Sequence, residues 1–196
     1  MAMENIMSIS RVTKLSLALV FVTFVAGCVV VDKVKYDFVL LNAEKAVESG
    51  NYSSAADQYR KAAELGSGEG AFWLSELYLG GKGVKKDTPS GLKWMQTASD
   101  RNYLPAQVMI GFWTLSGSNG IRKDETRGAQ IMLKAAEAKQ PIAMAAMGYL
   151  YMRGTGVKRN AAQALDWFQR ANAAGFFVPH ELLTLPGVEK TMGVKR

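Results

Sequence analysis

The stretch GTGVKRNAAQALDWFQRA, residues 154–171, repeats a phrase that the chain has already used. Residues 81–98 read GKGVKKDTPSGLKWMQTA, with the glycines, the basic pair and the tryptophan at matching places. A third and weaker copy follows Gly120, so Gly83, Gly120 and Gly156 recur with a period of roughly 36 residues. A fixed period of that size predicts stacked helix pairs, because one pair cannot bury its apolar face alone.

Each copy is expected to contain two helices joined by the glycine-containing turn. Small residues recur in the first helix, where two helices must approach closely: Gly70, Ala106 and Ala143, then Ser75, Gly111 and Gly148. We expect the first helices to end in a left-handed glycine at Gly81, Gly117 and Gly154. Asp87, Asp124 and Asn160 are predicted to cap the second helices, because their short side chains accept hydrogen bonds from backbone N–H groups.

An earlier helix pair fits the same plan. A helix from about Tyr36 to Ser49 is expected, then a turn at Gly50 and a second helix ending near Gly66. The chain is therefore predicted to be an all-α solenoid of about four antiparallel helix pairs. Residues 176–185 are expected to fold back as a cap, because the last repeat of such an array must cover its bare apolar face.

The recurring pattern A-x-x-x-L-G-x-L-Y…G-x-G-V…D…A-x-x-W…A-A…G resembles the Sel1-like repeat, a relative of the tetratricopeptide repeat. The clearest copy spans residues 143–175. The resemblance implies a right-handed α-solenoid, with a tetratricopeptide-like pair in 34–66, three Sel1-like repeats in 67–175, and a cap and tail in 176–196. This sequence departs from the pattern at Ser75, Thr114 and Ile131, where Gly, Tyr and Trp are usual.

The N-terminal segment indicates export. Residues 15–26, LSLALVFVTFVA, form a short apolar run after Arg11 and Lys14, which is typical of a secretory signal peptide in 1–27. The sequence VAGC that ends at Cys28 resembles a bacterial lipobox, which implies a lipid on Cys28 and a short tether in 28–33. Because Val29 and not Asp follows the cysteine, the resemblance implies the periplasmic side of the outer membrane.

The family resemblance also implies a binding role along a concave groove that the first helices line. Spacing of i, i+4 places one pair of side chains per helix on a common face. The predicted partner-binding residues are Phe72, Glu76, Val108, Phe112 and Tyr149, with Ala145 at the remaining equivalent position. The alternative is that the aromatic rings pack between neighbouring repeats, as aromatic stripes at helical spacing usually do.

A second candidate surface is a basic edge formed by the equivalent turns. Its residues are Lys85, Lys86, Arg122, Lys123, Lys158 and Arg159. With a formal net charge of +7, the chain favours acidic partners such as anionic lipid or an acidic protein. The alternative is a solvated edge whose charges keep the turns soluble.

Catalysis is not indicated. The chain has 1 Cys and 1 His, so it lacks the residues for a histidine-based metal site, and its glycines end helices instead of opening a phosphate loop. We therefore expect no enzyme activity, no cofactor, no metal and no nucleic acid partner, and a monomer that binds another protein. The leading hypothesis is a lipid-anchored scaffold in an envelope or secretion assembly. The alternative is an immunity protein against a type VI secretion effector, such as a phospholipase, which acts in the periplasm.

Overall fold

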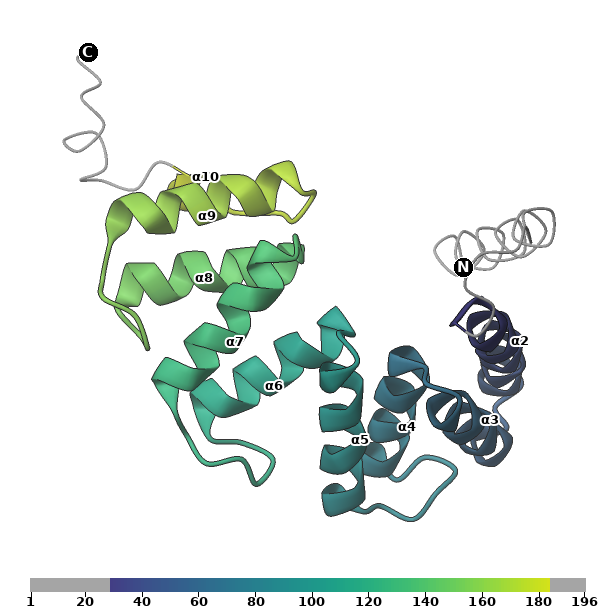
Figure 1. The fold of residues 1–196 in the computed structure, drawn as a ribbon. Coiled ribbons are helices and arrows are strands. Elements are labelled where there is room, and N and C mark those ends of the chain that lie inside the picture. The colour runs from purple at the N-terminus through teal and green to yellow at the C-terminus, as the bar shows by residue number, and fades with distance from the viewer. Residues whose placement is uncertain (1–28, 184–196) are drawn as a thin grey trace, which may run out of the picture.

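The computed structural model describes residues 29–183, and within this range the chain forms helices and turns without a strand. The elements are α2 (Val29–Glu48), α3 (Tyr52–Glu64), α4 (Gly68–Gly80), α5 (Thr88–Asp100), α6 (Leu104–Ser116), α7 (Glu125–Glu137), α8 (Pro141–Arg153), α9 (Ala161–Ala173) and the short α10 (His180–Leu183). Consecutive helices pair and stack in chain order into a curved array whose two ends lie far apart (Figure 1). The predicted solenoid of four helix pairs is confirmed.

The predicted helix ends are confirmed as well. The side chains of Asp87, Asp124 and Asn160 accept hydrogen bonds from backbone N–H groups in the first turns of α5, α7 and α9. The first helices α4, α6 and α8 end at glycines in the left-handed conformation, namely Gly81, Gly117 and Gly154. These local signals fix the 13-residue length of each of the six helices.

The first helix begins earlier than its sequence pattern indicated. Helix α2 starts at Val29, whereas we predicted a start near Tyr36, so residues 29–33 of the expected tether are helical. Cys28 and the signal segment lie outside the described residues. Among the helices of residues 29–183, none combines the length and the apolar character that a membrane span requires.

The core lies between neighbouring pairs, in three clusters that follow one another along the array. The first joins α2, α3 and α4, the second joins α3 to α6, and the third joins α6 to α9. Small residues allow the close approach. A Cβ on Gly148 would lie 2.5 Å from the ring of Phe168, and the Ser75 hydroxyl donates to the carbonyl of Gly91 at 2.7 Å.

The turns α4–α5 and α8–α9 also touch the helix pair before them. A Cβ on Gly83 would lie 2.1 Å from the carbonyl carbon of Tyr52, and one on Gly156 would lie 2.0 Å from the carbonyl oxygen of Glu125. The equivalent position at Gly120 is looser, since its nearest atom is Leu92 Cδ1 at 3.8 Å. The second glycine of the repeated phrase therefore couples one repeat to the next.

The predicted cap is present where it can be described. Val178 is buried, and Phe176 and Leu182 pack against the cluster formed by α6 to α9. The short helix α10 lies on α9 (Figure 1). Leu185, which we included in the cap, lies outside the described residues.

Candidate functional site

One stripe of side chains on each first helix lies mostly outside the core clusters, although Met109 packs against the second cluster and Ala146 belongs to the third. Its members stand at i, i+4 and i+7, which is one face of a helix. We call these positions the first-helix face: Phe38, Asn42 and Lys45 on α2; Glu69, Trp73 and Glu76 on α4; Pro105, Met109 and Phe112 on α6; Ile142, Ala146 and Tyr149 on α8. All of them are exposed or half-buried except Ala146. Because they are equivalent positions of stacked repeats, they form a continuous surface.

Three of the predicted groove residues lie on this face. Phe112 is 41% exposed and is one of the large apolar side chains that the core leaves uncovered. Tyr149 is exposed too, although its ring meets Phe168 edge-on with the centroids 5.0 Å apart. Glu76 is half-buried, and burial raises the pKa of its carboxyl group above the ordinary value. These three residues are available for a partner.

The assignment of Val108 was wrong, and so was that of its equivalent Ala145. Val108 is 5% exposed and belongs to the core cluster that α6 shares with α7, α8 and α9. The physical reason is the next helix pair, which covers this row of positions. Phe72 shares the row and is half-buried, and its ring packs against Trp73 and Tyr103 at centroid distances of 5.2 and 5.3 Å. At Phe72, Val108 and Ala145 the side chains therefore pack between helices, which is the alternative that the sequence analysis left open.

Three exposed residues of the first-helix face were missed by the sequence analysis. Trp73 is 39% exposed and follows Phe72 directly, and Ile142 precedes Ala145 by three residues. Phe38 lies on α2, where we had considered no groove position. Their signal was available, because Ile142 precedes Tyr149 by seven residues, which is two full turns of helix. We had compared only i, i+4 pairs.

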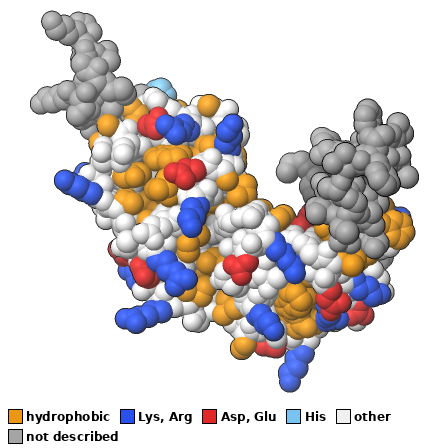
Figure 2. Space-filling view, in the orientation of Figure 1, with side chains coloured by type: hydrophobic (Ala, Val, Ile, Leu, Met, Phe, Trp, Pro, Cys, Tyr) orange, Lys and Arg blue, Asp and Glu red, His pale blue; other side chains and the backbone are white. Residues whose placement is uncertain are grey.

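The six basic residues of the predicted edge lie in or beside the turns α4–α5, α6–α7 and α8–α9. Every one of its six cations is exposed. Figure 2 shows blue side chains along the lower and left rim, where Figure 1 places the turns α4–α5, α6–α7 and α8–α9. Lys123 forms an ion pair with Glu125 at 2.7 Å, which lowers the charge that the middle turn offers. The edge can attract an anionic surface by long-range electrostatics.

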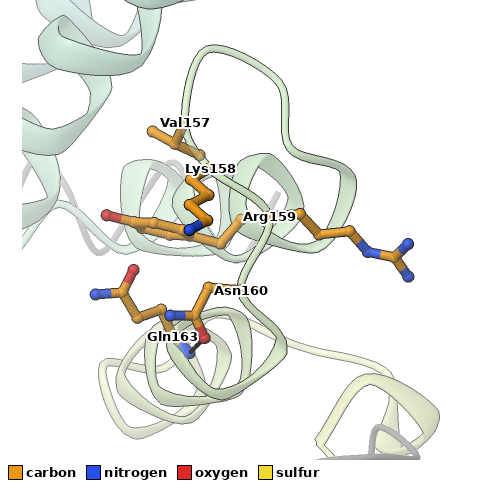
Figure 3. A pocket seen from close by; sticks show the side chains of 6 residues that line it. Val157, Lys158, Arg159, Asn160 and Gln163 are labelled. Carbon is orange, nitrogen blue, oxygen red and sulfur yellow. Dashed lines mark hydrogen bonds between the residues drawn. The ribbon is translucent and has the colours of Figure 1, made fainter.

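A shallow depression lies at the third of these turns. Its lining comes from the end of α8, the turn and the start of α9: Tyr151, Val157, Lys158, Arg159, Asn160 and Gln163. Figure 3 shows Lys158 along its wall, Arg159 pointing away, and Asn160 turned toward α9. The Asn160 amide oxygen already accepts from two backbone N–H groups as a helix cap. The described residues 29–183 also contain no cluster of three His, Cys, Asp or Glu side chains that could hold a metal.

The repeat geometry identifies the family. A model of the Sel1 repeat matches residues 42–67, 68–103, 104–139 and 141–176. The chain belongs to the Sel1 repeat family. The first match covers residues 42–67, where we had expected a tetratricopeptide-like pair and had counted three Sel1-like repeats after it. The difference follows from the short turn between α2 and α3, which lacks the long glycine-containing phrase of the other pairs.

A solved structure and two curated proteins are similar to this chain. A crystal structure of a Sel1 repeat protein from Oxalobacter formigenes is similar with a TM-score of 0.61 and 29% identity, covering 64% of this chain and 93% of that one. The chitin synthase regulator SKT5 of Saccharomyces cerevisiae is 32% identical over 119 residues, which are 60% of this chain and 17% of that protein. An exopolysaccharide production negative regulator of Rhizobium leguminosarum bv. viciae is 25% identical, covering 67% of this chain and 54% of the relative. The chain thus spans only part of the length of these curated relatives.

Proposed function

We propose that this Sel1 repeat protein is a lipid-anchored, periplasmic adaptor that binds a segment of another protein on its first-helix face. The observation that carries the proposal is the row of large apolar side chains on that face. Phe38, Trp73, Phe112, Ile142 and Tyr149 stay exposed in a fold that buries or half-buries the other large apolar side chains described on these helices. Exposed aromatic and aliphatic side chains in a continuous row are typical of surfaces that anchor a partner.

The names of the relatives support a regulatory adaptor role. Two of them are named as regulators, one of chitin synthase and one of exopolysaccharide production. Both names concern the making of a polysaccharide. We propose that the partner of this chain is a component of an envelope assembly, such as polysaccharide export or secretion machinery, for which the repeat array serves as a scaffold.

Crosslinking in intact cells followed by affinity purification tests the binding proposal. Phe112→Ala/Ile142→Ala removes two exposed anchors from α6 and α8, and the matched control Phe177→Ala removes an aromatic ring that is 82% exposed and lies off the first-helix face. We expect the double variant to lose the partner while the control retains it, with unchanged circular dichroism in both. Capture that survives the double variant would refute the proposal. A secreted effector as the captured protein would instead identify an immunity role.

The anchoring proposal rests on the sequence of residues 15–28 and is tested separately. Cys28→Ala removes the thiol that would carry the lipid, so we expect the variant to lose labelling by a fatty acid analogue. We also expect it to leave the outer-membrane fraction, since each buried CH₂ of an acyl chain contributes about 0.8 kcal/mol to membrane binding. Labelling of the Cys28→Ala protein at the wild-type level would contradict the anchor.

A further inference from the structure

The first-helix face changes chemical character along the array. On α6 and α8 its members are Pro105, Met109 and Phe112, then Ile142, Ala146 and Tyr149, and all are uncharged. On α4 the same three positions are Glu69, Trp73 and Glu76, so one tryptophan stands between two carboxylates. Glu76 occupies the position that Phe112 and Tyr149 hold in the following repeats. The acidic pair is therefore specific to α4.

The indole ring of Trp73 is held in place from behind. Tyr59 on α3, itself buried, stacks on Trp73 with a centroid distance of 6.4 Å and an interplanar angle of 27°. Phe72 meets the same ring edge-on, and the indole N–H donates to the Glu69 carboxylate at 3.4 Å. With 39% of Trp73 still exposed, the ring is a fixed aromatic surface with a carboxylate at its edge.

The two carboxylates of α4 that flank Trp73 in the sequence belong to a protein that is basic as a whole. Desolvation raises the pKa of the Tyr36 hydroxyl on α2, and the nearby carboxylates of Asp37 and Glu69 raise it further. Glu76 makes no hydrogen bond or ion pair within residues 29–183, and its burial raises its own pKa. The basic member of the first-helix face is Lys45 on α2, and within the part of the chain that the structure describes it forms no ion pair with Glu76.

A carboxylate that is half-buried without a partner lowers the stability of the free protein. Phe112 and Tyr149 show that the same position accepts an aromatic ring, which would avoid that cost. A cationic ligand would offset it, because an ion pair and a cation–π contact would form together. An arginine suits the site best, since its planar guanidinium stacks on an indole while its edges donate to carboxylates.

We propose that Glu69, Trp73 and Glu76 form a receptor for an arginine or lysine side chain of the protein partner. The basic side chain lies over Trp73 between the two carboxylates, and the apolar side chains of the same segment lie on α6 and α8. The partner segment is therefore amphipathic, with its cation toward the N-terminal end of the solenoid. This inference rests on the proposed function for the identity of the ligand as part of a protein.

The receptor can be tested without knowing the partner, by titrating the full-length protein in mild detergent with N-acetyl-arginine amide. N-acetyl-citrulline amide is the control, because it has nearly the same shape and no charge. The readout is the indole N–H signal of Trp73 in nuclear magnetic resonance, assigned with Trp73→Phe. We expect arginine to shift this signal at least threefold more than citrulline does at equal concentration, and to leave the buried Trp113 and Trp167 unaffected. Equal shifts would overturn the receptor.

Charge variants provide the second arm. Glu69→Gln/Glu76→Gln removes both carboxylates, and the control Glu64→Gln/Glu137→Gln removes two exposed carboxylates away from the first-helix face. We expect the first pair to weaken arginine binding about five- to tenfold and to reduce capture of the partner, with no effect of the control pair. An unchanged arginine affinity in Glu69→Gln/Glu76→Gln would overturn the receptor even if capture still depends on Phe112 and Ile142. Capture that is independent of Phe112 and Ile142 would refute the proposed function, and the arginine titration would still decide the receptor.

Discussion

Replacing Gly156 by alanine tests whether the repeated turn couples one helix pair to the one before it. The new Cβ would lie 2.0 Å from the Glu125 carbonyl oxygen and 2.9 Å from Ala129 Cβ, both on α7. Backbone atoms cannot yield as a flexible side chain can, so the turn between α8 and α9 has to move away from α7. That movement opens the interface between the third and fourth repeats.

Gly120 offers a matched control at the equivalent turn. Both glycines have a positive φ, +69° at Gly156 and +79° at Gly120, so alanine is strained by about 1–2 kcal/mol at either position. Only Gly156→Ala adds a steric conflict, because a Cβ on Gly120 meets no atom closer than 3.8 Å. Overpacking of this kind costs about 1–3 kcal/mol or more. We therefore expect losses of about 1–2 kcal/mol for Gly120→Ala and about 3 kcal/mol or more for Gly156→Ala.

Thermal unfolding of the full-length protein, followed by far-ultraviolet circular dichroism, measures the difference. For a chain of this size 1 kcal/mol corresponds to about 2–4 °C, so Gly156→Ala should lower the midpoint by about 6 °C or more and Gly120→Ala by clearly less. Since neighbouring repeats stabilise each other, the Gly156→Ala transition should also broaden or split. Equal shifts in the two variants would refute the contact argument and leave the left-handed conformation as the whole effect.

Three further predictions concern single side chains. Ser75→Ala removes the buried hydroxyl that donates to the Gly91 carbonyl, so we expect the thermal unfolding midpoint to fall by about 2–4 °C. The control Ser53→Ala changes an exposed serine and should leave the midpoint unchanged. An unchanged midpoint in Ser75→Ala would contradict this prediction. Lys139 has a positive φ of +64°, a left-handed conformation that glycine adopts without strain. Lys139→Gly should therefore raise the free energy of unfolding by about 0.5–1 kcal/mol in urea denaturation, while the control Lys134→Gly inside α7 should lower it. A lower stability of Lys139→Gly would show that the lysine side chain contributes more than the backbone strain costs. The pKa of Glu76 is raised in the folded protein, so its ionisation opposes folding, and the penalty grows as the pH rises from the unfolded-state pKa through the folded-state pKa. Glu76→Gln should accordingly raise the midpoint at pH 7 and change it little at pH 3, and the opposite order would indicate that the carboxylate has a stabilising partner.

Local signals predicted most of the fold because they act within a few residues. An Asp or Asn that caps a helix and a left-handed glycine that ends one depend on the adjacent backbone alone. Asp87, Asn160, Gly81 and Gly154 could therefore be assigned before the structure was known. The start of α2 at Val29 carried no comparable signal, and its prediction near Tyr36 was late by seven residues.

The candidate site was predicted only in part, because exposure depends on what the next helix pair covers. Val108 and Phe112 lie four residues apart on α6, and the spacing alone placed them on one face. In the fold Val108 is buried against the third and fourth repeats, while Phe112 remains 41% exposed. Helical periodicity predicts which side of a helix a side chain lies on. The packing of the neighbouring helix pair decides whether that side chain is covered.

The repeat, its period, the helix ends and the basic turns follow from residue types at short spacings, so they could be predicted before the fold was known. The packing of the helix pairs was needed to show which apolar side chains face outward and what lies behind Trp73. Helical spacing places Glu69, Trp73 and Glu76 on one face of α4, and the packing of α3 against α4 sets Tyr59 behind the Trp73 ring. That arrangement joins α3 to α4 across two repeats, and no local rule specifies a contact between residues that meet only after the repeats have packed.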